Sequence, residues 1–396
     1  MRVTDQAGGC RPTPLQERLL EAALLDGERA LEAWRAFRDA DGLNRLDHGS
    51  YRMLPMLYRN LLRLAPDDPD LGRLRGVHRR AWYETRLMLK HMAPVLQLIH
   101  DAGMPTLLLK GAPLAFLYYG DAGLRPMNDI DILVPEERAW EAIGLLEAAG
   151  WRRGAPWKGL RERDLRFRHS MSFEHASGRQ FDLHWHALYL ACFRGADQPF
   201  LEASETWEFE GIPTRALCPA DQLIHTCAHG LMWNEIPPMR WVADAITVMK
   251  TRKVDWERLV ELTEWLGVSL PMREGLKYLA DRFSAPVPEH VPVRLRAIQV
   301  SRGKRLNYER QQAPEKLQGM RDTVLALGSE YATMARGRTL VRKLVDVPRY
   351  LQFYWGLGTT SEVISMAGRW VSRRFRLRLR SSLAPGDAIE GRIAGQ

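Results

Sequence analysis

Apolar residues repeat every three or four positions between Pro14 and about His100, beginning with Leu15, Leu19 and Leu24. That spacing forms an apolar stripe along one side of a helix, so this region is predicted to be helical. The segment Pro66–Pro69 interrupts the repeat and indicates a loop between two helices.

The middle of the chain has shorter apolar runs separated by turn residues. Residues 106–119 predict a strand, a turn at Lys110-Gly111 and a helix. Residues 130–134 predict a second strand. Residues 135–149 predict a second helix, because a proline favours the start of a helix and a glycine follows the last helical position.

Two further runs show the alternation of apolar and polar residues that is typical of strands, at 169–175 and 180–186. Residues 176–179 between them have the composition of a hairpin loop, so the two strands are expected to pair antiparallel. The order strand, helix, strand, helix, hairpin predicts an α+β fold. In that fold a small mixed β-sheet is flanked by N-terminal and C-terminal helical regions.

Helical periodicity returns after Cys218-Pro219 and continues to about Phe283. The proline-rich residues 286–292 are expected to form a linker. The sequence therefore predicts four parts, namely a helical N-terminal region (1–100), a catalytic domain (101–215), a helical domain (216–290) and a helical C-terminal region with a basic tail (291–396).

The chain carries 57 Lys and Arg residues against 48 Asp and Glu residues, which gives a net charge of +9. This excess favours anionic ligands such as nucleotides, nucleic acid or lipid headgroups without choosing among them. The four cysteines show no Cys-x-x-Cys pairing, and no run of about eighteen apolar residues is present. We therefore expect a cytoplasmic protein without a transmembrane segment, peripheral to a membrane at most.

Three aspartates carry the strongest chemical signal in the sequence. Asp129 and Asp131 are two residues apart at the start of a predicted strand, where such side chains point to the same face. Asp182 lies in a later strand in which apolar and polar residues alternate. An Asp-x-Asp triplet alone is common in solvated loops, but carboxylates on adjacent strands repel one another unless divalent cations lie between them. Oxygen ligands suit Mg²⁺ or Mn²⁺, so we predict that all three aspartates are catalytic and bind metal.

Residues near the aspartates predict a phosphate-binding site. Lys110 and Gly111 occupy a turn from strand to helix, where free N–H groups and the helix dipole favour a phosphate. Lys110 and Arg125 can add direct positive charges. His184 and His186 share the predicted strand face of Asp182, and we prefer His184 as a residue of the nucleotide site.

Two other features allow more than one interpretation. His225 and His229 are four residues apart on a predicted helix and could ligate zinc, but no glutamate stands beside His225 as in metalloproteases. We therefore favour core or capping positions for both histidines. The run Arg369–Arg380 holds six arginines and no acidic residue. It suits contact with an anionic membrane or with RNA, and it equally suits a solvated helix face.

A Lys-Gly turn, an arginine, an Asp-x-Asp triplet and a later aspartate follow one another along the chain, here as Lys110-Gly111, Arg125, Asp129-Ile130-Asp131 and Asp182. This order resembles the nucleotidyltransferases of the DNA polymerase β superfamily, in particular a large and mostly uncharacterised bacterial branch. The resemblance covers about residues 100–250. It implies that the three aspartates bind the catalytic metal and that a nucleoside triphosphate, with ATP preferred, is the donor.

The first turn departs from the wider superfamily, which carries Gly-Ser where this chain has Lys110-Gly111 followed by Ala112. The bacterial branch shares this difference. A weaker similarity continues through residues 217–221, His225, His229 and 240–244, and it assigns no role to them.

The expected function is transfer of a nucleoside monophosphate from ATP or another triphosphate to an unidentified acceptor, with Mg²⁺ or Mn²⁺ as cofactor. One alternative is a nucleotide-binding module without catalysis that serves a biosynthetic cluster. Another is phosphoryl transfer on the same scaffold. The products separate the three, because nucleotidyl transfer releases pyrophosphate, phosphoryl transfer releases ADP, and a binding module releases neither.

Overall fold

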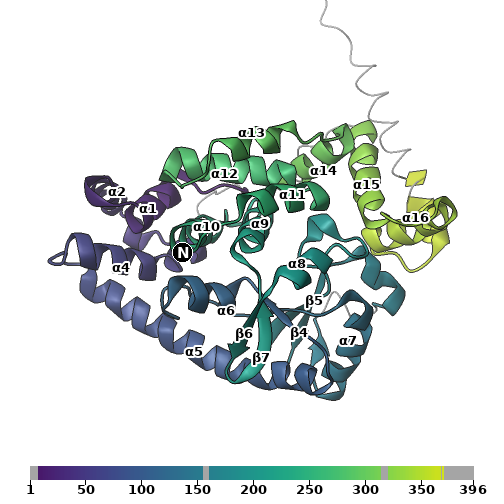
Figure 1. Cartoon of the computed structure of the whole chain (residues 1–396), viewed down its shortest axis with the longest axis horizontal. Helices are drawn as coiled ribbons and strands as arrows, with labels where there is room; N and C mark the ends of the chain where they lie inside the picture. The colour runs from purple at the N-terminus through teal and green to yellow at the C-terminus, as the bar shows by residue number, and fades with distance from the viewer. Residues whose placement is uncertain (1–7, 155–159, 314–319, 367, 370–396) are drawn as a thin grey trace, which may run out of the picture.

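The computed structural model describes residues 8–154, 160–313, 320–366 and 368–369 of the 396-residue chain. In this part of the chain one seven-stranded mixed sheet is covered by helices that precede and follow it in the sequence (Figure 1). The predicted α+β class is confirmed, and so is the arrangement of a mixed sheet with helical regions on both sides of it in the sequence.

The seven strands are β1 (Leu107–Leu109), β2 (Asp131–Leu133), β3 (Arg152–Arg153), β4 (Ser170–Glu174), β5 (Gln180–His184), β6 (Glu205–Phe209) and β7 (Ile212–Ala216). They lie in the order β3-β4-β5-β2-β1-β7-β6. The pairs β2–β5 and β1–β7 are parallel, and the other neighbouring pairs are antiparallel.

The elements expected between residues 106 and 186 are present. The turn after β1 leads into α6 (Gly111–Pro113) and the π-helical segment η2 (Leu114–Tyr119), and β2 is followed by η3 (Glu136–Arg138) and α7 (Ala139–Ala148). Strands β4 and β5 form the expected antiparallel hairpin.

Strand β3 and the hairpin β6–β7 were not predicted. The hairpin turns through Glu210 and Gly211, whose φ angles of 49° and 83° both lie in the left-handed region. Two consecutive residues of that kind match the twist of the flanking strands. The hairpin extends the sheet because β7 pairs with β1, more than a hundred residues earlier in the chain.

The N-terminal helices are α1 (Pro14–Leu24), α2 (Gly27–Asp39), η1 (Gly42–Asn44), α3 (His48–Tyr51), α4 (Leu54–Leu64) and α5 (Leu71–Asp101). The predicted helical region is therefore confirmed, with the loop at 66–69 between α4 and α5. The first helix starts in a capping box, because the Thr13 side chain accepts from the Gln16 N–H while the Gln16 side chain accepts from the Thr13 N–H.

The later helices are α8 (Gln198–Ala203), α9 (Pro219–Gly230), α10 (Arg240–Thr251), α11 (Trp256–Leu266), α12 (Ser269–Phe283), α13 (His290–Ala297), α14 (Arg302–Gln312), α15 (Met320–Met334) and α16 (Leu340–Trp355). The expected linker at 286–292 is wrong in its second half, because α13 begins at His290. Val291 and Leu295 are buried on this helix. Pro292 lies in its first turn, where a missing N–H breaks no helical hydrogen bond.

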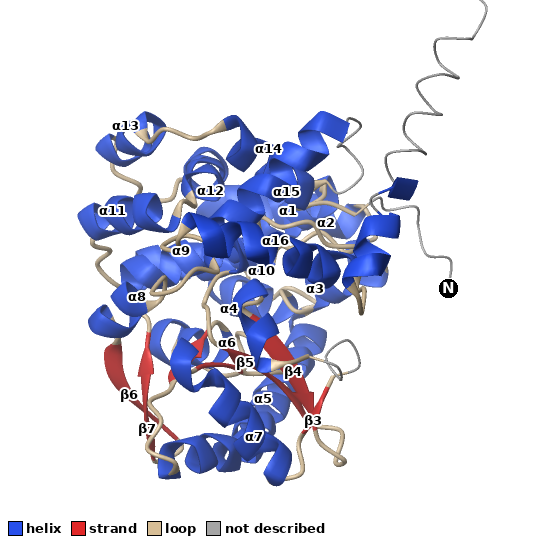
Figure 2. Ribbon diagram, turned by 90° about the vertical axis from the view of Figure 1, so that its right-hand side faces the viewer, coloured by secondary structure: helices blue, strands red, loops and turns tan. Residues whose placement is uncertain are grey.

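The sheet separates two hydrophobic cores. Leu108 of β1 packs with α5 and α7 in one core, while Leu107 and Leu109 face a second core that joins α1–α4 to α9–α13. Figure 2 shows the strands below the layer that contains α9 to α14. The helices before and after the sheet therefore share one core, while the four-part division of the chain stays a prediction.

Two expectations concern membranes. Within the described residues, no helix combines the length and the apolar character needed to cross a bilayer. Of the basic run Arg369–Arg380, residues 370–380 lie outside the described residues, so its binding to an anionic membrane or to RNA stays a prediction.

Candidate functional site

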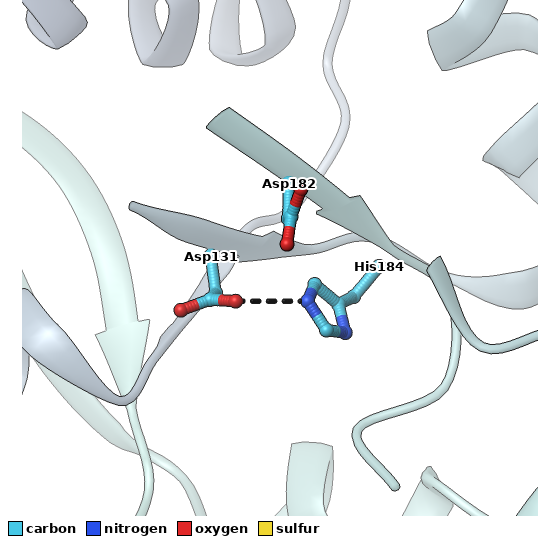
Figure 3. A group of neighbouring side chains, drawn as sticks. All are labelled: Asp131, Asp182 and His184. Carbon is cyan, nitrogen blue, oxygen red and sulfur yellow. Dashed lines mark hydrogen bonds and ion pairs between the residues drawn. The ribbon is translucent and has the colours of Figure 1, made fainter. Parts of the chain in front are cut away.

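The site is built on the two parallel central strands β2 and β5. Their register pairs Asp131 with Asp182 and Leu133 with His184. Because residues at paired positions and two residues apart share one face of a sheet, Asp131, Asp182 and His184 point to the same side. One ligand atom from each lies within 4.8 Å of the other two. Figure 3 shows the three side chains gathered on this side of the two strands. The alternate residues of β5, Phe181 and Leu183, are buried on the opposite face, in the core with α5 and α7.

Asp131 is the most enclosed carboxylate of the group, at 4% exposure. Lys110 Nζ donates to its Oδ1 over 2.6 Å, and His184 Nε2 lies 3.0 Å from the same oxygen. Burial by itself would raise the pKa of Asp131, but the Lys110 ammonium and His184 hold that pKa well below its ordinary value. Asp131 is therefore an anion that is ready to bind a cation.

Asp182 is half-buried beside Asp131. Burial, followed by the negative charge of Asp131, raises the pKa of Asp182 above its ordinary value, and the charge of Asp129 acts in the same direction. The two paired carboxylates thus differ in their affinity for protons. Such a difference is typical of sites where one carboxylate binds a cation and the other can exchange a proton.

His184 has an orientation suited to metal binding. Its Nδ1 lies 3.3 Å from the His186 carbonyl oxygen, and its Nε2 faces Asp131. When Nδ1–H donates to that carbonyl, the lone pair on Nε2 is directed at the carboxylates, which is the usual arrangement of a metal-ligating histidine. The His186 ring itself is turned away to the Asp197 carboxylate, with Nδ1 at 2.6 Å. Only His184 joins the aspartates.

The turn between β1 and α6 brings Lys110 to the site. Lys110 has φ 48° and ψ −107°, an unusual backbone conformation for a residue with a side chain. Gly111 follows in close contact, since a Cβ at this position would lie 3.0 Å from Met127 Sδ and 3.2 Å from Arg125 Nη1. A residue with a side chain at 111 would therefore push against Arg125.

Asp129 lies two residues before β2 begins at Asp131, so the two aspartates do not share a strand face as we had expected. It is exposed, and it is not one of the three residues whose ligand atoms cluster. The charge of Asp129 acts on Arg52 and Arg240, where it opposes the lowering of their pKa values by burial. The negative charge of Asp129 therefore acts both on Asp182 and on these two arginines.

Arg125, which we expected to contact phosphate, is almost fully buried and forms a bidentate ion pair. Its Nε and Nη2 donate to Asp244 Oδ1 and Oδ2 over 2.8 and 2.9 Å. The Tyr119 hydroxyl also donates to Asp244 Oδ1, over 2.8 Å. This network fixes Arg125 between the Lys110 turn and α10 and leaves Nη1 next to Gly111.

A cavity of about 330 Å³ adjoins the Lys110 turn. Its charged and aromatic lining residues come from α3 and the turn after it, the Lys110 turn, the loop before β2, α9 and α10. They are His48, Arg52, Lys110, Arg125, His225, His229, Arg240, Trp241 and Asp244. His225 and His229 thus border this cavity. Among the described residues, neither of them belongs to a group of side chains close enough together to hold a metal ion. Burial and then Lys110 lower the pKa of His225 to about 3.

Arg52 and Arg240 were missed as site residues by sequence reasoning. Arg52 belongs to the N-terminal helical region and has no motif around it. Arg240 stood in a segment of weak similarity without a role. Apart from that similarity, the only signal for Arg240 in the sequence was its position two residues after Pro238.

The donor set of two carboxylates and one imidazole fits a divalent cation. Carboxylate oxygens suit Mg²⁺ and Mn²⁺, and an imidazole nitrogen suits transition metals better than Mg²⁺. The adjoining positive charges suit phosphate groups. The arrangement can therefore bring a metal ion and a phosphate-bearing molecule together.

One comparison with known proteins, the match to a protein family, agrees with this chemistry. A family model described as "Uncharacterised nucleotidyltransferase" matches residues 50–284, more than half of the chain. No curated protein matches the chain. The crystal structure of an antigenic nucleotidyltransferase-like protein from Paracoccidioides brasiliensis aligns with a TM-score of 0.31 and 13% sequence identity, covering 50% of this chain and 93% of that chain.

Proposed function

Because the chain belongs to the family of uncharacterised nucleotidyltransferases, we propose that it transfers a nucleoside monophosphate from a nucleoside triphosphate, with ATP preferred, to an acceptor hydroxyl or phosphate. The observation that carries the proposal is the grouping of Asp131, Asp182 and His184 on one face of β2 and β5. Their ligand atoms have the spacing that a divalent cation requires.

Asp131, Asp182 and His184 would hold Mg²⁺ or Mn²⁺. When bound, such an ion neutralises charge on the reacting phosphate and supports an in-line attack. Asp129 lies outside this group, and we assign it to a second ion that arrives with the triphosphate. The negative charge of Asp129, which acts on both Asp182 and Arg52, supports that assignment.

Asp182 is proposed to accept the proton of the attacking hydroxyl at a carboxylate oxygen. Asp182 is half-buried, whereas Asp131 is only 4% exposed and is held by Lys110 and His184, so Asp182 is the carboxylate that an acceptor can reach more easily. In this step the acceptor oxygen forms a bond to the α-phosphorus. The bond from the α-phosphorus to the oxygen that bridges it to the β-phosphorus breaks, and pyrophosphate leaves.

Lys110 and Gly111 are proposed to bind the phosphates of the donor. In the structure the Lys110 ammonium neutralises Asp131. A cation bound to Asp131 would release it toward the donor, while Gly111 lets a phosphate approach the backbone closely. Arg125 supports the turn through its contact with Gly111.

The test uses the full chain with Mg²⁺, each α-labelled triphosphate and a cell extract as the source of acceptor. We expect a labelled product and pyrophosphate, both lost in Asp131→Asn and Asp182→Asn. The matched control is Asp281→Asn, which removes an exposed carboxylate on α12 and should leave transfer unchanged. Release of ADP without pyrophosphate, or full activity of the Asp131 variant, would overturn the proposal.

A further inference from the structure

The cavity beside the Lys110 turn is lined by residues that do not belong to the group of Asp131, Asp182 and His184. It opens between the N-terminal helices and the α9–α10 pair, and its volume of about 330 Å³ lies at the low end of the range of small-molecule sites. Lys110 borders both the cavity and Asp131. Whatever binds there therefore lies directly beside the clustered carboxylates.

The arginines of this cavity carry more positive charge than its acids can balance. Asp244 neutralises Arg125 and Asp131 neutralises Lys110. Arg52 and Arg240 form no ion pair within 4.0 Å with any carboxylate among the residues that the structure describes. The Arg240 guanidinium donates from Nη1 to the Pro126 carbonyl oxygen over 3.0 Å, and to no other group among the described residues.

These guanidinium groups also repel one another. Burial, then the charges of Arg125 and Arg52, lower the pKa of Arg240 to about 10. Burial and then Arg125 likewise lower the pKa of Arg52, against the opposing effect of Asp129. Both arginines are half-buried, and like charges that are partly removed from water destabilise the folded chain unless an anion lies between them.

Polar groups without partners border the same space. The indole Nε1 of Trp241 is buried and has no hydrogen-bond partner among the residues that the structure describes. His225 is buried as well, and within the described residues neither of its ring nitrogens has a partner within 3.5 Å, although the Ala187 backbone acts on the ring. Helix α10 begins here at Arg240 without a side-chain cap, so the positive end of its dipole lies at the cavity. Three independent features therefore favour an anion with several acceptor oxygens.

We propose that this cavity is a phosphate-binding site in which Arg52 and Arg240 are the principal ligands, with Lys110 linking it to the metal group. The proposal rests on nucleotidyl transfer as the function of the chain. The phosphates can belong to the triphosphate tail of the donor or to a phosphorylated acceptor, and both sources offer the same chemistry to the two arginines. The helical regions on either side of the sheet then serve catalysis directly, because each supplies one of the two ligands.

The test titrates inorganic tripolyphosphate into the full chain, without added metal, by calorimetry. We expect saturable binding that is about 10- to 100-fold weaker in Arg52→Gln and in Arg240→Gln, the effect of losing one charged hydrogen-bond donor. The control is Arg296→Gln, an exposed arginine on α13, which should bind like the unchanged protein. Thermal unfolding of each variant verifies that the fold is retained.

A competition experiment separates the two sources. If ATP displaces tripolyphosphate, the cavity holds the tail of the donor. If ATP and tripolyphosphate bind together, the cavity holds a phosphate of the acceptor. Absence of saturable binding, or unchanged affinity in both folded arginine variants, would reject the site.

The outcome for this site is distinct from the outcome for nucleotidyl transfer. Labelled product that depends on Asp131, together with unchanged tripolyphosphate binding in the arginine variants, rejects the cavity site and keeps the proposed function. Arginine-dependent binding without transfer from any triphosphate keeps the cavity as a phosphate site and rejects the proposed function.

Discussion

Lys110 Nζ lies 2.6 Å from Asp131 Oδ1, so an ammonium group neutralises the most enclosed carboxylate of the site. A divalent cation that binds Asp131 must compete with this ammonium. Lys110 is also the residue that borders the arginine-lined cavity. The proposed metal site and the proposed phosphate site should therefore be coupled through this one side chain.

Replacing Lys110 with Met tests this coupling. Without the competing ammonium, Lys110→Met should bind Mn²⁺ about threefold or more tightly in the absence of nucleotide, because a repulsive charge is removed. Nucleotidyl transfer should fall, since the donor loses a phosphate contact. Electron paramagnetic resonance of free Mn²⁺ measures the affinity, with Lys277→Met on the surface of α12 as control. Weaker Mn²⁺ binding in Lys110→Met would contradict the competition.

Replacing His184 with Gln tests the nitrogen ligand. We expect Mn²⁺ affinity to fall about 10-fold or more, comparable to the loss of an orienting partner at known metal sites. The nitrogen coupling in the Mn²⁺ spectrum should disappear as well. His290→Gln, at an exposed position on α13, is the matched control. A spectrum with the same nitrogen coupling in His184→Gln would show that another histidine binds the ion.

Replacing Asp129 with Asn separates the first ion from the second. Because Asp129 lies outside the clustered ligand atoms, Mn²⁺ binding without nucleotide should stay within about twofold of the unchanged protein. Transfer should fall about 100-fold, the loss expected when an electrostatic contact to the transition state is removed. Equal losses of metal affinity in Asp129→Asn and Asp131→Asn would place both aspartates on the first ion.

The buried pair of Arg125 and Asp244 should matter for stability. Asp244→Asn leaves a buried guanidinium without its carboxylate and should cost about 3–5 kcal/mol in the free energy of unfolding. The double variant Arg125→Met/Asp244→Leu should cost less than the sum of the single changes. Urea unfolding gives these values. Glu84→Gln breaks an exposed pair on α5 and should cost about 1 kcal/mol or less.

The buried contact between His186 and Asp197 predicts that the stability of the fold depends on pH. Burial would lower the pKa of His186, but the hydrogen bond and charge of Asp197 raise it above the ordinary 6.5. The folded state thus binds the proton more tightly than the unfolded state. The resulting stability is fully present below pH 6.5 and is lost as pH rises through the folded pKa.

Thermal unfolding between pH 6 and pH 9 measures this effect. The difference in Tm between the unchanged protein and Asp197→Asn should be largest at the acid end and should shrink as pH rises. Asp281→Asn, exposed on α12, should show a constant difference. A difference in Tm between the unchanged protein and Asp197→Asn that grows with pH would contradict a raised pKa of His186.

The sequence by itself determined the elements whose signals are local. Helical spacing located α1, α5 and the helices after Pro219, and two-residue alternation located β4 and β5. The same alternation put Asp182 and His184 on one strand face, opposite Phe181. These predictions succeeded because side-chain periodicity depends only on neighbouring residues.

Tertiary structure decided the features that join distant parts of the chain. Strand β7 pairs with β1 through backbone hydrogen bonds that no local pattern encodes. The register of β2 against β5 groups Asp131 with Asp182 and His184 and leaves Asp129 outside that group. Arg52 and Arg240 meet only because helices from both ends of the chain share one core. The packing of those apolar faces depends on the whole chain. The residues that neighbour Arg52 or Arg240 in the sequence therefore do not show that the two arginines lie close together.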